Sequence, residues 1–181
     1  MAKQLPSQSR LAELFEYNQH TGFLVWRTRR GNQVPGSVAG SRNYTIKRTP
    51  ANIAVGVDGR VYNASRLIWV MVHGDGSIPV GHEIDHINRN PFDNRLDNLR
   101  IATKQQNTQN RIRSNNSGHK GIYYTPEGRW MARLWIGGKN VNLGTFTDIS
   151  DAVAAYASAS EMVHGEFAPL SLRTSLRTTS T

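Results

Sequence analysis

The sequence predicts an α+β protein, in which short antiparallel strands combine with a few helices. Three observations favour this class. An Asp-Gly pair at 58–59 lies between two runs of β-forming residues, which is a strong signal for a two-residue hairpin. Apolar residues recur at helical spacing within 65–72. Three strand-like runs separated by glycine turns then precede an alanine-rich helical stretch at 149–163.

The chain up to residue 75 is expected to form an α/β scaffold. Ser7 and Ser9 are candidate caps of a first amphipathic helix, and Gly74 ends a second one. Glycine, serine and proline recur through the segment between the first strand and the hairpin, which predicts a loop there. The expected elements are a helix at 11–17, a strand at 23–26, a loop at 31–50, a hairpin at 53–62 and a helix at 65–72.

The stretch 82–111 carries the densest set of polar functional residues, in the order HEIDHINRNPFDNRLDNLRIATKQQNTQNR. Apolar residues at both ends of an Asn-rich loop favour two short strands. Thr103 and Gln106 have the spacing of a capping box and therefore predict the start of a helix. The predicted order is a strand at 83–87, a loop at 88–98, a strand at 99–101 and a helix to about 111.

Asp85, His86 and Asn107 are side chains of the types that phosphodiester hydrolysis requires. The attacking water must lose a proton and the phosphate charge must be neutralised, which calls for a base beside a hard cation. Imidazole has an ordinary pKa of about 6.5, so His86 suits the base. Asp85 and the amide of Asn107 offer the oxygen ligands that magnesium prefers. Adjacent strand residues point to opposite faces, so Asp85 and His86 converge only if the strand twists or ends between them.

This stretch resembles the HNH endonucleases, especially the phage and intron-encoded homing type with a DHIN…DNRxxNLR…QNxQNR pattern. The resemblance implies the ββα-metal fold and metal-dependent cleavage of double-stranded DNA, leaving 5′-phosphate and 3′-hydroxyl ends. By this resemblance Asp85 is a metal ligand and His86 is the general base. Asn98 orients the histidine ring, and Asn107 is the second metal ligand. An amide at Asn107 implies magnesium or manganese, and no structural zinc is expected because the chain has no cysteine.

The same residues also have structural interpretations. An isolated Asp-His pair is commonly solvated polar surface, and Asn107 alone would be an exposed helix residue. Asparagine tolerates left-handed backbone and caps its own turns, and we assign that role to Asn88, Asn90 and Asn94. For Asn98 a turn role stays an alternative to the catalytic one. The ordered set as a whole favours the nuclease interpretation.

The chain is strongly basic, with 22 Lys and Arg against 13 Asp and Glu and a formal net charge of +9. Eight basic residues and one acidic residue lie between Arg100 and Lys139, and the same numbers lie between Arg27 and Arg66. Such a field favours a polyanion, so double-stranded DNA is the expected partner, with a generic basic protein as the alternative. The basic residues between Arg27 and Arg66 suit either a supporting DNA contact or a scaffold role.

A three-stranded antiparallel sheet packed on one helix is expected after a polar linker at 113–118. Glycine turns separate three runs of β-forming residues. Thr147 or Asp148 can cap the helix that follows. Alternation along the second strand places Trp130 and every second residue after it toward this helix, and the residues between them outward. The expected strands are 120–124, 129–136 and 140–143, and the helix is 149–163.

Residues 120–170 resemble the ethylene-response-factor type of DNA-binding domain known from plant transcription factors. The resemblance is carried by KGI at 120–122, GRW at 128–130, LGTF at 143–146 and AAY at 154–156. It implies a sheet laid in the major groove, while an unrelated sheet-and-helix module is the alternative. The plant pattern has arginines where Tyr123 and Thr125 stand, so no plant target site is implied. The expected DNA contacts of the whole chain are Lys104, Arg111, Arg113, Lys120, Tyr123, Thr125, Arg129, Arg133, Trp135 and Asn142.

The sequence therefore predicts a phage- or mobile-element-type HNH homing endonuclease with a C-terminal DNA-recognition domain. A non-catalytic, sequence-specific DNA-binding regulator is the alternative, and an RNA-directed protein is disfavoured because no RNA-stacking motif is present. Short apolar runs predict no membrane segment, and we expect a cytoplasmic location, in a bacterial host if the chain is phage-encoded. No obligate protein partner is expected. The expected regions are a scaffold at 1–75, a nuclease unit at 76–112, a linker at 113–118, a DNA-binding domain at 119–170 and a disordered tail at 171–181.

Overall fold

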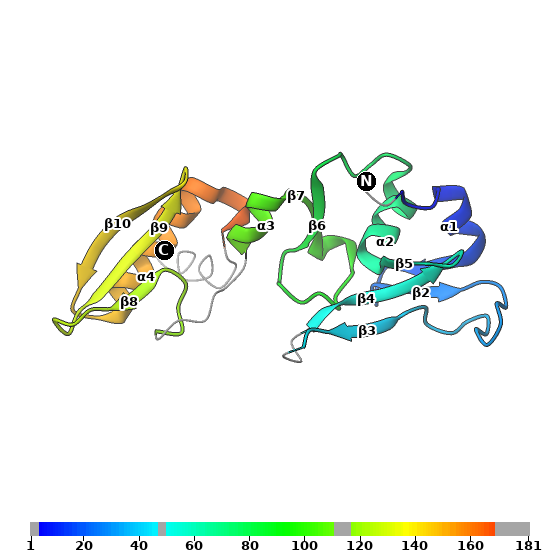
Figure 1. Cartoon of the computed structure of the whole chain (residues 1–181), viewed down its shortest axis with the longest axis horizontal. Helices are drawn as coiled ribbons and strands as arrows, with labels where there is room; N and C mark the ends of the chain where they lie inside the picture. Colours follow the sequence, from blue (N-terminus) through cyan, green and yellow to red (C-terminus); the bar gives the residue numbers. More distant parts are fainter. Residues whose placement is uncertain (1–3, 47–49, 111–116, 169–181) are drawn as a thin grey trace, which may run out of the picture. The chain divides into compact units, whose positions relative to one another are not determined.

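The computed structural model describes residues 4–46, 50–110 and 117–168 (Figure 1). The chain forms two compact units, one spanning residues 1–104 and the other 105–181. No helix within the described ranges is long and apolar enough to cross a membrane. The predicted linker lies partly, and the predicted tail wholly, outside the described residues.

The N-terminal unit combines two α-helices with antiparallel strands among its described residues, which confirms the predicted α+β class. The strands form a β1-β2 hairpin, a β3-β4-β5 sheet and a β6-β7 hairpin. In chain order the elements are α1 (Gln8–Leu14), β1 (Phe15–Asn18), β2 (Phe23–Trp26), β3 (Ser41–Tyr44), β4 (Pro50–Val57), β5 (Arg60–Asn63), α2 (Ala64–His73), β6 (His82–His86) and β7 (Leu99–Thr103).

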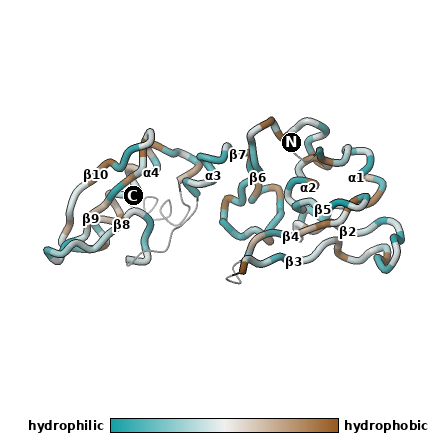
Figure 2. Tube along the Cα trace, in the orientation of Figure 1, coloured by the Kyte–Doolittle hydropathy of each residue, from teal (hydrophilic) through white to brown (hydrophobic). Residues whose placement is uncertain are grey.

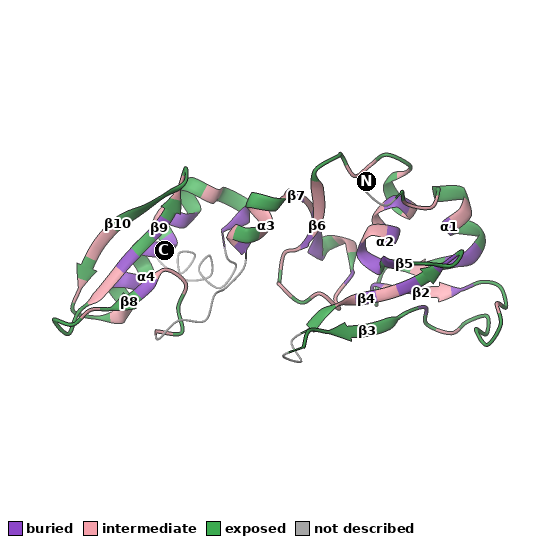
Figure 3. Ribbon diagram, viewed as in Figure 1, coloured by how far each residue is buried: buried purple, intermediate pink, exposed green. Residues whose placement is uncertain are grey.

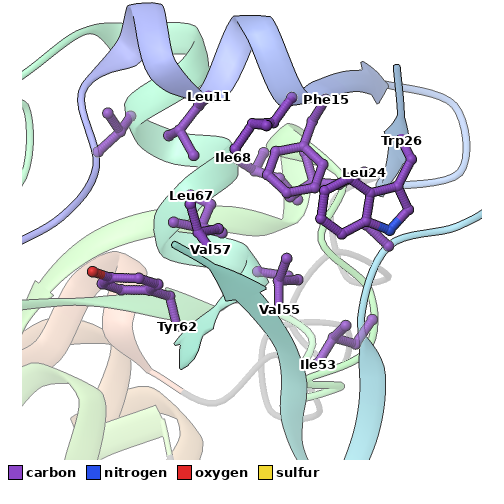
Figure 4. Close-up of a cluster of buried hydrophobic side chains, with 14 of the residues drawn as sticks. Leu11, Phe15, Leu24, Trp26, Ile53, Val55, Val57, Tyr62, Leu67 and Ile68 are labelled. Atoms are coloured by element: carbon purple, nitrogen blue, oxygen red, sulfur yellow. The ribbon is translucent and has the colours of Figure 1, made fainter. Parts of the chain in front are cut away.

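One hydrophobic core holds this unit together, and Figure 4 shows its centre. Leu67 and Ile68 of α2 are fully buried in it. Phe15 and Trp26 are opposite each other in the β1-β2 hairpin, with ring centroids 4.5 Å apart. Burying each such side chain stabilises the fold by about 1.5–3 kcal/mol. Leu99 of β7 belongs to the same core, so the hairpin that carries Asp85 and His86 is anchored on the N-terminal scaffold.

Two predicted elements of this unit differ from the structure. The first helix ends at Leu14 rather than Tyr17, because Phe15 begins a strand whose pairing with β2 outweighs the local helical pattern. The segment 31–50, predicted as loop, contains β3, which pairs with β4 and is exposed along its whole length (Figure 3). A fully exposed strand has no buried face and therefore gives no alternating apolar signal.

The other N-terminal signals are confirmed. The Oγ atom of Ser7 accepts a hydrogen bond from the Arg10 backbone amide at 3.2 Å and so caps α1. Asp58 and Gly59 form the turn between β4 and β5 with φ angles of 47° and 74°, as a two-residue hairpin requires. Gly74 follows the last residue of α2 with φ 92°. The loop that follows β6 is largely hydrophilic, as its predicted polar character requires (Figure 2).

The C-terminal unit contains a sheet of order β10-β9-β8, antiparallel throughout, with α4 packed against it. Ala132 and Leu134 of β9 are buried against Ala152 and Tyr156 of α4, which confirms the predicted sheet on one helix and its inward face. Asp148 is the residue that precedes the helix. The elements are α3 (Lys104–Asn110), which starts at the last residue of the N-terminal unit, β8 (Ile122–Tyr124), β9 (Trp130–Ile136), β10 (Lys139–Phe146) and α4 (Ile149–His164).

Candidate active site

The β6-β7 hairpin carries two of the four predicted catalytic residues at the end of a strand. Asp85 pairs with Arg100, and His86, the last residue of β6, pairs with Leu99. Strand pairing continues through Asp85 and ends at His86, whose side chain contacts Asn94 of the loop that follows. Both lie at the end of the hairpin from which the loop 87–98 departs, and a substrate that contacts both must bind at this end.

Asp85 is buried in an ion pair with the residue opposite it. Its side chain accepts hydrogen bonds at Oδ2 from Nε of Arg100 at 2.9 Å and from Nη2 at 2.7 Å. Asp85 is 4% exposed and Arg100 is 9% exposed. A buried charge must be paired, and this guanidinium compensates the carboxylate charge within the protein. Residue type and spacing gave no indication that Arg100 is the partner of Asp85.

Asn98 closes the loop between the two strands. Its Oδ1 accepts from the backbone amide of Asn88 at 2.8 Å, and its Nδ2 donates to the carbonyl of Asp93 at 2.7 Å. Its own carbonyl accepts from the amide of Ile87 at 2.9 Å. The side chain thus joins both ends of the loop, which matches the turn role left open for Asn98. The histidine contact that we predicted for Asn98 is made by another asparagine.

Asn94 is the residue that contacts the His86 ring. Its Oδ1 lies 2.9 Å from Nε2 of His86, and because an amide oxygen can only accept, Nε2 carries the proton. Neutral imidazole has one protonated nitrogen, so Nδ1 is the basic one. Burial lowers the pKa of His86, with a smaller opposing effect from the Asn94 hydrogen bond. His86 is therefore neutral at physiological pH, as a general base must be.

The assignment of Asn94 as a plain turn residue is therefore wrong, whereas the same assignment is confirmed for Asn88 and Asn90. The Oδ1 atoms of those two accept from backbone amides two residues later, at 2.8 and 3.1 Å. Asn94 is instead 1% exposed, and its Nδ2 is buried without a hydrogen-bond partner among the described residues. Leaving such a donor unpaired costs about 1–3 kcal/mol. Sequence offered no signal for this, since all three asparagines lie in the same polar loop.

The N-terminal hairpin supports the Asn94 backbone. The hydroxyl of Tyr17 on β1 donates to the Asn94 carbonyl at 3.1 Å. Burial raises the pKa of Tyr17, so this hydroxyl stays protonated and remains a donor. Gly22, between β1 and β2, has φ 74°, and a Cβ at this position would lie 2.6 Å from the Arg95 backbone nitrogen. Only glycine allows the hairpin to approach the loop this closely.

The described residues contain no group of three or more His, Cys, Asp or Glu side chains that could hold a metal ion. Asp85 is the carboxylate nearest in the chain to His86, and it is occupied by Arg100. The donors predicted for the cation are oxygen atoms only, from one carboxylate and one amide. This set fits a hard cation that keeps most of its water ligands, and it does not fit a tetrahedral nitrogen and sulfur cage.

The remaining predicted residues of the nuclease motif lie at or after the end of the N-terminal unit. Asn107 is a half-buried residue of α3, and Lys104 is the exposed first residue of that helix. Arg111 and Arg113 lie outside the described residues. The predicted roles of these four residues stay predictions.

The outer face of the β10-β9-β8 sheet presents most of the predicted C-terminal DNA contacts. Arg133 is opposite Asn142, and both are exposed. Trp135 is 51% exposed and Tyr123 is 45% exposed, which is unusual for large aromatic side chains. Arg129 is exposed directly before β9, and one guanidinium nitrogen donates to the Thr145 carbonyl at 3.1 Å. Exposed arginine, asparagine and aromatic side chains on one sheet face suit contacts with nucleic acid.

Two further predicted contacts have structural roles within this unit. Thr125 is half-buried in the turn between β8 and β9, where its amide donates to the Arg129 carbonyl at 2.8 Å. The ammonium group of Lys120 donates to the backbone carbonyl of Gln109 in α3. Neither residue is presented to solvent as fully as Arg133 or Trp135.

Comparisons with known proteins agree with the motif. Residues 62–109 match a protein-family model described as HNH endonuclease. The chain is 37% identical over 106 residues to Protein 3.8 of Escherichia phage T7, covering 57% of this chain and 87% of that protein. It is 32% identical over 103 residues to an uncharacterized HNH endonuclease of Acanthamoeba polyphaga mimivirus, covering 57% of this chain and 54% of that protein. No solved structure matches. The family model ends at residue 109, before the sheet of the C-terminal unit.

Proposed function

Because the chain belongs to the HNH endonuclease family, we propose that it is a metal-dependent endonuclease that hydrolyses phosphodiester bonds in double-stranded DNA. The observation that carries the proposal is the half-buried, neutral His86, held by Asn94 at the end of β6 directly after Asp85. A histidine kept neutral and held by a hydrogen bond at the end of a paired strand suits proton abstraction from water.

In the proposed reaction Nδ1 of His86 accepts a proton from the attacking water. The proton on Nε2 stays in its hydrogen bond to Asn94, which stabilises the imidazolium that forms. The loop that carries Asn94 is held by Asn98 and by Asp93, whose carboxylate accepts a hydrogen bond from Nδ2 of Asn88 at 2.8 Å. The base is thus placed by a network that needs little rearrangement during the reaction.

A magnesium or manganese ion is the proposed cofactor, with Asp85 as its carboxylate ligand. Asn107 is the proposed amide ligand, because it stands at the corresponding position of the motif. When bound, such an ion neutralises charge that develops on the phosphate and on the leaving oxygen. Because the Asp85 carboxylate is paired with Arg100, binding of the ion requires Asp85 to share or exchange this contact. The metal affinity should therefore depend on the ion pair.

The C-terminal unit is proposed to recognise DNA through the outer face of its sheet. Arg133, Asn142 and Trp135 are exposed on one face, while the opposite face packs on α4. Lys104, Arg111, Arg113 and Lys120 are proposed as phosphate contacts, which supply affinity without reading sequence. A homing-type nuclease must cleave at a site that it recognises. We propose that this chain is such a nuclease, with recognition by the C-terminal unit and cleavage by the N-terminal one.

The test uses the full-length chain and phage genomic DNA. Strand breaks are expected with magnesium and not with a chelator, and the ends should be 5′-phosphates. Asp85→Ala should raise the magnesium concentration needed for half-maximal cleavage by at least about tenfold. Asp97→Ala, which removes an exposed carboxylate near the end of the loop, is the control and should leave this concentration unchanged. Equal magnesium dependence of the two variants would contradict the role of Asp85.

A non-catalytic DNA-binding regulator is the second candidate. The observation in its favour is that the proposed metal ligand Asp85 forms a buried ion pair with Arg100. This candidate predicts site-specific DNA binding with no strand breaks at any magnesium or manganese concentration.

A further inference from the structure

We propose that Asn94 is a positioning residue for His86, and that the N-terminal β1-β2 hairpin holds Asn94 in place for this task. The inference rests on the proposed function, because a fixed ring matters most when His86 acts on substrate. It extends the functional site from the 82–111 motif to residues Tyr17 and Gly22, which lie at least sixty positions earlier in the chain.

The first step is the contact between the two side chains. The Asn94 Oδ1 atom is 2.9 Å from Nε2 of His86 and can only accept a hydrogen bond. It therefore selects the ring form with the proton on Nε2 and directs the basic Nδ1 away from Asn94. A histidine partner that fixes both ring form and orientation is a recurring requirement of catalytic histidines.

The second step is how Asn94 is held. Its carbonyl accepts from Tyr17 at 3.1 Å, and the peptide that follows it lies against Gly22, where a Cβ would come within 2.8 Å of the Asn94 carbonyl carbon. Both contacts come from the same hairpin, β1-β2, whose strands are packed in the main core through Phe15 and Trp26. The hairpin thus fixes the backbone, and the backbone fixes the amide that faces His86.

The third step is the cost of using asparagine here. Its Nδ2 is buried and has no hydrogen-bond partner in the described part of the chain. The one hydrogen bond that this side chain makes in the described part of the chain is the one to His86, so at a site that is 1% exposed asparagine supplies that contact at the cost of an unpaired donor. Residues that lower stability in this way are typical of functional sites.

The test combines nitrogen NMR of the histidine ring with single-turnover cleavage by the full chain. At a pH where the ring is neutral, His86 of the unmodified protein should show a protonated Nε2 and an unprotonated Nδ1. Asn94→Leu should lose this preference and slow cleavage by at least about tenfold. Asn94→Asp keeps an accepting oxygen and should retain the ring form and cleave faster than Asn94→Leu.

The support from the β1-β2 hairpin is tested with two tyrosines. Tyr17→Phe should slow cleavage several-fold, whereas Tyr62→Phe, which alters a buried tyrosine in the same core, should not.

A protonated Nδ1 in the unmodified protein would overturn the inference, as would an Asn94→Leu variant that cleaves at the normal rate. If Asn94→Leu fails to fold, loss of the ring form in Asn94→Asp, or equal rates for Tyr17→Phe and Tyr62→Phe, would overturn it. Absence of cleavage by the unmodified chain would contradict the proposed function instead. In that case the ring spectra still test the role of Asn94. A protonated Nε2 in the unmodified protein that is lost in Asn94→Leu would support it, and the same ring form in both proteins would overturn it.

Discussion

Replacing Arg100 by methionine tests both the buried ion pair and the capacity of Asp85 to hold a cation. The variant keeps a long side chain but leaves Asp85, which is 4% exposed, without the guanidinium 2.7 Å away. Removing one partner of a buried pair typically costs about 3–5 kcal/mol. For a unit of this size each kcal/mol lowers the thermal midpoint by about 4–8 °C, so a fall of at least about 12 °C is expected.

Magnesium should partly reverse this loss. A cation that binds the folded variant at ten times its dissociation constant adds about 1.4 kcal/mol, or about 6–11 °C in midpoint. The assay is thermal unfolding followed by circular dichroism, with and without magnesium. Arg95→Met removes an exposed arginine from its pair with Asp93 and should leave the midpoint close to normal. The double variant Asp85→Asn with Arg100→Met should regain most of the lost stability, because no unpaired charge remains.

Two results would refute this reasoning. A midpoint of Arg100→Met equal to that of Arg95→Met would show that the pair does not stabilise the fold. A large loss that magnesium leaves unchanged would show that Asp85 does not hold the cation in this protein, and the proposed metal ligand would then be wrong.

Three further predictions follow from the structure. The neutral form of His86 is the base and burial lowers its pKa, so the cleavage rate should rise with pH around a midpoint below about 6.5. A rate midpoint above about 6.5 would contradict this assignment of the base. Because the unfolded chain binds the His86 proton more tightly than the folded chain, the free energy of unfolding should also fall as pH drops below about 6.5. Gly22→Ala should destabilise the fold by more than Gly36→Ala in urea unfolding, because both have positive φ but only Gly22 abuts backbone atoms; equal losses would disprove the close approach. Arg133→Ala should weaken DNA binding by about 1–3 kcal/mol and relax its sequence preference, whereas Met162→Ala on the exposed side of α4 should do neither; unchanged affinity and preference of Arg133→Ala would remove Arg133 from the proposed DNA contacts.

The parts of the fold that sequence predicted well have local causes. The Asp58-Gly59 turn and the stop at Gly74 depend on backbone preferences of one or two residues. Alternation along β9 was visible because one face of the strand is buried and the other is not. The strand β3 was missed because all four of its residues are exposed, so burial left no pattern in its sequence.

The candidate site was predicted less completely, because its contacts join residues far apart in the chain. Asp85 and His86 were identified by residue type and order. The pairing of Asp85 with Arg100 depends on the register of β6 and β7 across fifteen positions, which sequence spacing did not fix. The choice between Asn94 and Asn98 as the partner of His86 depends on how the loop folds, and both are asparagines in the same polar run. The contact from Tyr17 depends on tertiary packing alone.

The most direct test of the account is the single-turnover cleavage rate of His86→Ala in magnesium, measured beside its DNA affinity. The account predicts a loss of at least about a hundredfold in rate with unchanged affinity. The control, His20→Ala, removes an exposed histidine in the turn between β1 and β2 and should cleave normally. A His86→Ala variant that cuts DNA as fast as the His20→Ala control would contradict the assignment of His86 as the base.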